Sequence, residues 1–253
     1  MPHSPAQTAR RALALLDLTE LGDAATFEHV DELCRRAVGP HGSVAAVCVW
    51  PRHVARATER LWGTNVRVAT VVNFPFGDEP VHEVVTATAQ ALADGADEID
   101  LVLPYRALME GDLLQPTAML DFVRAAVPAD SHLLKVILET GELVDPELID
   151  QAARLAIEHG ADFVKTSTGK TPRSATLEAT GIMLRAIRDA GGSTGRRVGL
   201  KPSGGIRTVA DAAAYLQQAD DLMGSDWVTP STFRFGASGL LDALIAALDE
   251  PAE

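Results

Sequence analysis

The four lysines of this chain are its most informative residues, because the other 18 of its 22 lysine and arginine residues are arginines. Lys135, Lys165 and Lys201 stand in apolar runs that are typical of strands, and Lys170 comes five residues after Lys165. Arginine stays charged, whereas a desolvated lysine can lose its proton and attack a carbonyl carbon. These positions therefore indicate imine chemistry. The alternative, that they are chance ion-pair partners, is disfavoured by the cost of burying an unneutralised ammonium group.

Lys165 and Lys201 lie in consecutive strand-like runs, so their ammonium groups are expected to lie close together. At about 4 Å and an effective dielectric of about 20, two such charges repel by roughly 4 kcal/mol. That energy corresponds to about 3 pKa units, which would lower the pKa of one lysine to about 7. The pattern alone does not say which of the two lysines attacks.

Strand-like and helical segments alternate along the whole chain. Strands are expected at Leu15–Thr19, Val44–Trp50, Val66–Asn73, Glu98–Leu103, Leu133–Glu139, Asp162–Thr166, Val198–Lys201 and Thr232–Gly236. Helices are expected at Phe27–Val38, His53–Leu61, Val81–Ala93, Met119–Val127, Glu147–His159, Leu177–Ala190, Val209–Gln217 and Leu240–Leu248.

Eight strand–helix units predict an α/β protein, a single (β/α)8 TIM barrel, with one domain over residues 1–253. Residues 1–10 and 249–253 are expected to be loose. An open doubly wound sheet is the alternative, but the chain lacks a dinucleotide fingerprint after its first strand.

Local signals mark several helix ends. Asp145 before a proline and Thr208 three residues before an acid are expected N-caps. Gly95, Gly160 and Gly191 are expected to end helices in the left-handed conformation.

Barrel active sites lie at the carboxyl ends of the strands, where this chain places charged residues. Asp100 is embedded in the apolar run EIDLVLPY, where a charge is costly unless it is paired or used. A structural ion pair with a lysine on the neighbouring strand is the alternative, and both readings can hold. Because side chains alternate along a strand, Phe163 is expected to face inward with Lys165, and Gly199 to leave space beside Lys201.

Glycines after the last two strands indicate a phosphate site. Gly204 and Gly205 follow the seventh strand, while Gly236 and Ser238 end the eighth, directly before a helix. Glycine lets backbone N–H groups approach an anion, and barrels often bind phosphate at these loops. The turn of residues 167–170 could add a hydroxyl and a cation. The alternative reading is two tight turns and a serine N-cap.

Composition excludes several classes of partner. The net charge of −13 argues against nucleic acid and anionic membranes as partners. Cys34 and Cys48 are expected to be reduced packing residues, and Cys48 could line a pocket. The seven histidines show no ligand spacing, so no metal site is expected. The chain carries no secretory signal or membrane-length apolar run, and a cytoplasmic location is expected.

Taken together, the motifs resemble the bacterial deoxyribose-phosphate aldolases, which are class I aldolases on a (β/α)8 barrel. The resemblance extends from about residue 10 to residue 245. It rests on LLDLTEL, VCVWPR, ATVVNFPFG, GADEIDLVLPYRALMEGD, LLKVILETGEL, GADFVKTSTGK, VGLKPSGGIRT and RFGAS. The pairing of FVKTSTGK with KPSGGIRT is highly specific.

The resemblance implies a role for each matching residue. Lys165 would form the Schiff base, Lys201 would lower its pKa, Asp100 would transfer protons with a bound water, and Lys135 would hold Asp100. The substrate-binding residues implied in the same way are Asp17 and Thr168 for the sugar, and Gly169, Lys170, Gly204, Gly205, Gly236 and Ser238 for the phosphate.

The implied reaction is reversible cleavage of 2-deoxy-D-ribose 5-phosphate to D-glyceraldehyde 3-phosphate and acetaldehyde, in deoxyribose catabolism and without a cofactor. The expected partners are therefore a phosphorylated sugar and aldehydes, and the family often forms homodimers. Two departures stand out: Gly239 replaces a second serine, and the chain ends in DEPAE rather than in a tyrosine. The alternatives are another phosphate-binding barrel aldolase and a barrel that binds a sugar phosphate without turnover.

Overall fold

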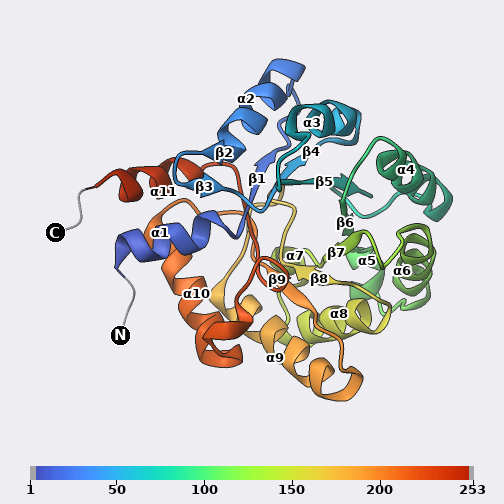
Figure 1. Ribbon diagram of the computed structural model, residues 1–253. Helices are drawn as coiled ribbons and strands as arrows, with labels where there is room; N and C mark the ends of the chain where they lie inside the picture. The colour runs from blue at the N-terminus through green and yellow to red at the C-terminus, as the bar shows by residue number, and fades with distance from the viewer. Residues whose placement is uncertain (1–3, 251–253) are drawn as a thin grey trace.

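A single sheet of eight parallel strands forms the centre of the molecule, with helices around it (Figure 1). The computed structural model describes residues 4–250, and of residues 192–194 the backbone alone. The strands are β1 (Leu16–Glu20), β4 (Ala46–Val49), β5 (Arg67–Val72), β6 (Glu98–Val102), β7 (Leu133–Ile137), β8 (Phe163–Lys165), β9 (Gly199–Lys201) and β10 (Phe235–Ala237). All eight fall on the strands expected from the apolar runs.

The sheet closes on itself. Its strands follow the order β10-β1-β4-β5-β6-β7-β8-β9, with β1 paired in parallel to both β10 and β4. The two ends meet through single bridges, Leu200 to Phe233 and Ser203 to Gly236. Strand, crossover helix and next strand in a closed parallel sheet define a (β/α)8 barrel. The predicted fold is therefore confirmed, and the open doubly wound alternative is wrong.

Eight helices occupy the expected positions between the strands. They are α2 (Phe27–Ala37), α3 (Val54–Leu61), α4 (Val81–Ala93), α6 (Leu114–Ala126), α8 (Pro146–Glu158), α9 (Leu177–Thr194), α10 (Val209–Met223) and α11 (Leu240–Asp249). Short elements that the apolar pattern did not predict are α5 (Tyr105–Met109), α7 (Thr140–Leu143), the 3₁₀ turns Pro51–His53 and Ser225–Trp227, and a hairpin of β2 (Val38–Gly39) and β3 (Gly42–Ser43). Elements of two to five residues are too short to show a period.

An additional helix, α1 (Pro5–Leu13), precedes the barrel and lies beside α10 and α11 (Figure 1). Ser4 caps it, Ala9 is fully buried, and Arg11 donates to both carboxylate oxygens of Asp220 at 2.5 Å. Of the N-terminal segment expected to be loose, residues 5–10 are thus held in this helix. Residues 1–3 and 251–253 lie outside the part of the chain that the structure describes.

Most of the expected helix ends are present. Asp145 accepts a hydrogen bond from the backbone of Glu147, and Thr208 forms a capping box. Gly95 and Gly160 have φ of 101° and 92°. The prediction for Gly191 is wrong, because α9 continues to Thr194 and ends at Gly195, with φ of 67°.

The barrel interior combines apolar and charged side chains. A Cβ atom on Gly199 would lie 2.3 Å from the ring of Phe163, so this glycine makes room for an aromatic side chain in the core. Charged residues from β1, β6, β7, β8 and β9 are buried in the same interior. Burial of so many charges requires mutual pairing, which the next section describes.

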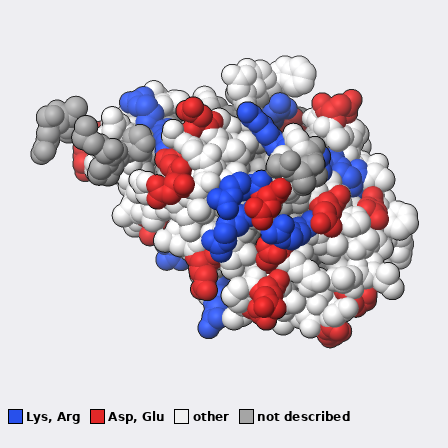
Figure 2. Space-filling model, turned by 90° about the horizontal axis from the view of Figure 1, so that it is seen from below, with Lys and Arg blue, Asp and Glu red and all other residues white. Residues whose placement is uncertain are grey.

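The outer surface carries charges of both signs. On the face shown in Figure 2, basic side chains lie among acidic ones rather than in a separate patch. Within residues 4–250, no helix combines the length and apolar character needed to cross a membrane.

Candidate active site

Strand register brings the predicted site residues together. Lys165 on β8 lies opposite Lys201 on β9, and Asp100 on β6 lies opposite Lys135 on β7. The four residues therefore face one another inside the barrel, although they are far apart in the sequence.

Asp100 is the centre of this group. Its Oδ1 accepts a hydrogen bond from Lys135 Nζ at 2.7 Å, while its Oδ2 accepts from Lys165 Nζ and Lys201 Nζ, each at 2.8 Å. Lys165 is 4% exposed and the other three residues are fully buried. Burial alone would raise the pKa of Asp100, but the three lysines hold it well below its ordinary value. The carboxylate is thus ionised and shared by three amines.

The three lysines differ in their proton affinity. Burial lowers the pKa of Lys165, and nearby Lys201 lowers it further, which together outweigh the attraction of Asp100. For Lys201, burial acts in the same direction, but Asp100 and Asp17 raise its pKa overall. Lys135 likewise has a raised pKa, because Asp100 and Glu98 outweigh its burial. Lys165 is therefore the amine in this group that loses its proton most readily.

This result refines the sequence-based argument. Repulsion by Lys201 does lower the pKa of Lys165, but burial is the larger cause. The sequence left open which of the two lysines attacks, and access to a cavity favours Lys165. Lys165 lines a cavity, whereas Lys201 is fully buried.

The cavity lies at the carboxyl ends of the strands and has a volume of about 960 Å³. The predicted site residues that line it are Lys165, Thr168, Gly169, Lys170, Gly204, Gly205, Gly236 and Ser238. The remaining four, Asp17, Asp100, Lys135 and Lys201, lie inside the barrel behind this lining.

Asp17 is placed differently from a sugar-binding residue. Its side chain is fully buried, with Oδ2 2.5 Å from Lys201 Nζ and Oδ1 2.6 Å from a guanidinium nitrogen of Arg234. Burial would raise the pKa of Asp17, but these two cations hold it well below its ordinary value. Contact with the sugar stays a prediction, and the observed contacts make Asp17 a partner of Lys201.

The loops predicted to bind phosphate present backbone to the cavity. Gly169, Gly204 and Gly205 have φ of 79°, 82° and 79°, a region that disfavours side chains. Helix α11 has Gly239 as its N-cap and no side-chain cap, so its first N–H groups are left for another acceptor. Ser238 does not cap this helix, so the serine N-cap alternative is wrong. An anion at this point would complete the helix terminus.

Arg207 lines the same cavity and was missed by the sequence analysis. It adds a cation beside Gly204 and Gly205, where an anion would bind. Its position two residues after the glycine pair in KPSGGIRT was the signal that could have identified it. Ser203 also lines the cavity, and its buried Oγ has no hydrogen-bond partner among the described residues.

Thr168 and Lys170, two other residues predicted to bind substrate, have protein partners at the rim of the cavity. Thr168 donates a hydrogen bond to Glu139 Oε2 at 2.5 Å. Lys170 pairs with Asp23 at 3.1 Å, and its Nζ lies 5.9 Å from the ring centroid of Trp50. Lys170 therefore faces the loop after β1. A bound anion would have to draw its side chain away from that loop.

The two cysteines, and the histidines between residues 4 and 250, form no site of their own. Cys34 and Cys48 are buried free thiols, and burial raises the pKa of each. Among the residues that the structure describes, no three His, Cys, Asp or Glu side chains are arranged to hold a metal ion.

A parallel barrel with a lysine of lowered pKa at its mouth is the arrangement of an imine-forming barrel enzyme. Comparison with known proteins agrees. Residues 11–244 match the family described as DeoC/LacD family aldolase. The chain is 52% identical over 252 residues to a deoxyribose-phosphate aldolase of Agrobacterium fabrum (strain C58), which covers 98% of this chain and 95% of that protein.

Solved structures agree with the sequence match. One from Coccidioides immitis is 32% identical, has a TM-score of 0.81, and covers 94% of this chain and 86% of that one. Another from Toxoplasma gondii ME49 is 28% identical, has a TM-score of 0.87, and covers 97% of each chain. Both are provisionally described as deoxyribose-phosphate aldolases. The chain belongs to the DeoC/LacD aldolase family.

Proposed function

We propose that this chain is a lyase that cleaves 2-deoxy-D-ribose 5-phosphate reversibly to D-glyceraldehyde 3-phosphate and acetaldehyde. The observation that carries the proposal is Lys165, a buried amine of lowered pKa that reaches the cavity while bonded to an ionised carboxylate. The 52% identity to a protein of this name supports the choice of substrate.

Lys165 Nζ attacks C1 of the open-chain sugar, and loss of water leaves an iminium ion. Electrons of the C2–C3 bond flow into the iminium as the C3 hydroxyl loses its proton, which releases glyceraldehyde 3-phosphate. The remaining enamine is protonated at C2, and hydrolysis then frees acetaldehyde and the amine. Asp100, 2.8 Å from Lys165 Nζ, accepts and returns the protons through a water molecule. General acid–base help of this kind contributes about 10²–10⁴ in rate.

The substrate phosphate binds where the chain offers backbone N–H groups and cations. Gly204, Gly205 and the start of α11 supply the donors, and Arg207 supplies a charge. A phosphate bound there leaves C1 of the sugar free to reach Lys165, which lines the same cavity. Asp100 then transfers protons, while the glycine loops and Arg207 bind the phosphate.

Assembly, location and domain organisation belong to the same proposal. A cytoplasmic enzyme with one domain over residues 1–253 that forms a homodimer fits the family and the single closed sheet. Light scattering after gel filtration measures the mass in solution, and a monomer at micromolar concentration would remove the dimer from the proposal.

Borohydride trapping tests the reaction. Reduction in the presence of 2-deoxy-D-ribose 5-phosphate should attach the substrate to Lys165, as mapped by peptide mass spectrometry, and untreated enzyme should release acetaldehyde. Lys165→Arg should abolish both signals. An adduct on Lys201 would move the nucleophile, whereas trapping without acetaldehyde release would favour an aldolase of another sugar phosphate. Binding without either signal would indicate a barrel without turnover.

A further inference from the structure

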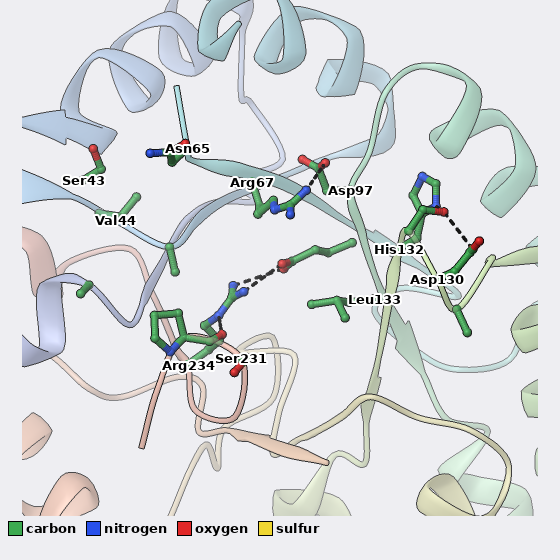
Figure 3. Close-up of a pocket in the computed structure, with 16 residues that line it drawn as sticks. Ser43, Val44, Asn65, Arg67, Asp97, Asp130, His132, Leu133, Ser231 and Arg234 are labelled. Atoms are coloured by element: carbon green, nitrogen blue, oxygen red, sulfur yellow. Dashed lines mark hydrogen bonds and ion pairs between the residues drawn. The ribbon is translucent and has the colours of Figure 1, made fainter. Parts of the chain in front are cut away.

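An ion pair at the other end of the barrel is connected to the candidate active site. Arg234 precedes β10 and donates to Glu98 Oε1 at 2.9 Å and to Asp17 Oδ1 at 2.6 Å. Figure 3 shows Arg234 at a second pocket of about 510 Å³, which lies at the amino ends of the strands. Arg234 and Glu98 are 4% and 1% exposed, and neither lines the substrate cavity.

Two chains of ion pairs run from this end to Asp100. On one side, Arg234 binds Asp17, and Asp17 binds Lys201 at 2.5 Å. On the other side, Glu98 Oε2 lies 2.7 Å from Lys135 Nζ. Lys201 and Lys135 both donate to Asp100, which also accepts from Lys165. The buried ionic cluster therefore consists of Asp17, Glu98, Asp100, Lys135, Lys165, Lys201 and Arg234.

The charges of this cluster balance when Lys165 is neutral and its other six members are ionised. It holds three carboxylates, and its cations apart from Lys165 are also three, namely Lys135, Lys201 and Arg234. A neutral Lys165 leaves the cluster uncharged, whereas a protonated Lys165 leaves one uncompensated positive charge in a buried interior. Because an isolated buried charge is costly, the balance favours the free amine.

We propose that Glu98 and Arg234 are positioning residues that set the protonation of Lys165 by fixing the net charge of the buried ionic cluster. The proposal rests on the proposed role of Lys165 as the imine-forming amine. Neither residue needs to touch substrate, because the charge acts through Lys135, Asp17 and Lys201.

Other ionisable groups face these residues. Cys48 and Glu139 face Lys165, and burial raises the pKa of each. Neither is altered by the substitutions below, so their effect on Lys165 is the same in the wild type and in the variants. At the second pocket, Arg67 pairs with Asp97 at 3.0 Å in a solvent-exposed position. Asp130 and His132 also line that pocket, on the open loop before β7. Solvent screens these groups far more than it screens the buried cluster.

Two substitutions should shift the protonation of Lys165 in opposite directions. Arg234→Gln removes a positive charge, so protonation of Lys165 becomes easier and its pKa rises. Glu98→Gln removes a negative charge, so protonation becomes harder and the pKa falls. Each shift should be about one pH unit, the order expected for a charge several ångströms away in a protein interior. The measurement is the pH dependence of borohydride trapping of acetaldehyde, which carries no phosphate.

The controls separate charge from structure. Arg234→Lys keeps the charge, and the double variant Glu98→Gln/Arg234→Gln restores the balance, so both should trap with the wild-type pH midpoint. Thermal unfolding of each variant is measured first. If one single variant does not fold, the remaining single variant must still shift the pH midpoint of trapping. The double variant must still leave that midpoint unchanged, so these two variants test the inference.

The outcomes also separate this inference from the proposed function. If wild-type enzyme forms no adduct at Lys165, the proposed function fails. If wild-type enzyme traps normally and the folded single variants keep its midpoint, or shift it in the same direction, the charge-balance inference is overturned and the proposed function stands.

Discussion

At the scale of single residues, the chemistry depends on how three similar amines are made different. Lys135, Lys165 and Lys201 all donate to Asp100. Lys135 and Lys201 each have a second carboxylate, Glu98 and Asp17 respectively, whereas within residues 4–250 Lys165 forms an ion pair with Asp100 alone. Burial lowers the pKa of all three amines, and each nearby carboxylate raises it. With one carboxylate partner, Lys165 has a lowered pKa, whereas Lys135 and Lys201, with more, have raised pKa values.

Replacing Lys201 by leucine should raise the pKa of Lys165, because the second cation that lowers it is lost. The acid limb of the pH profile of kcat/KM, which reports the free enzyme, should move to higher pH by about one unit or more. Lys170→Leu is the matched control. It removes a lysine that pairs with Asp23 at the rim, and should change KM without moving that limb. An acid limb unchanged in Lys201→Leu would contradict the argument.

At the scale of elements, the carboxyl ends of β8, β9 and β10 contribute different functional groups to one cavity. The end of β8 carries the amine, and the loops after β9 and β10 carry glycines and the open start of α11. In the proposed function these loops bind phosphate through the main chain, so their effect depends on backbone conformation. A substitution that strains the backbone should therefore affect binding more than the chemical step.

Gly204→Val should raise KM for 2-deoxy-D-ribose 5-phosphate by about tenfold, equivalent to about 1.4 kcal/mol of lost binding. Gly204 has φ of 82°, and a Cβ there would lie 2.5 Å from Ser174 Oγ. KM for unphosphorylated deoxyribose should change much less. Gly111→Val is the control, since Gly111 also has φ of 82° and lies outside the cavity. Equal changes in KM for both sugars would remove the phosphate loops from the proposal.

Elements with a clear apolar period were predictable from the sequence, and their alternation was enough for the barrel. The same holds for the grouping of Lys165, Lys201 and Asp100, which follows from strand alternation and from the rule that barrel sites lie at strand ends. Helix α1 was missed because its apolar stretch was read only as an excluded signal sequence. Glu98 was missed as well, although it lies two residues before Asp100 and so faces the same side of β6.

Arg234 could not be identified in the same way. It falls in the last of the expected strands, directly before the three residues of β10, where alternation gives little guidance. Its partners Glu98 and Asp17 are distant in sequence, so the pairing depends on closure of the barrel. The sequence shows which charges are present, but their arrangement around one another comes from the register of all eight strands.

At the scale of the whole molecule, the buried ionic cluster connects most of the barrel strands, with the exception of β4 and β5. Its members come from β1, β6, β7, β8 and β9 and from the residue before β10. The loss of one charge is therefore felt by several strands at once, and the stability of the fold should depend on pH.

Acid should destabilise the protein through Asp17 and Asp100. Both have pKa values held below their ordinary value of 3.8. A depressed carboxylate pKa contributes stability above the ordinary value, and that contribution is lost as the pH falls through the folded-state pKa. The free energy of unfolding, measured by urea titration, should fall steadily below about pH 4.

Salt provides the control for this prediction. Exposed ion pairs are screened by about 0.5 M sodium chloride, whereas buried pairs are screened much less. The decline in acid should therefore persist at high salt. If high salt abolishes it, surface charges rather than the buried ionic cluster are responsible.

The order of these charges along the chain has one more consequence. All three acids of the buried ionic cluster, Asp17, Glu98 and Asp100, belong to the first half of the polypeptide, and all of its bases come after residue 130. A chain divided between α6 and β7 would yield an acidic half-barrel and a basic one, each unable to neutralise its own inner wall. The two halves are electrostatic complements, so we expect neither to fold stably without the other.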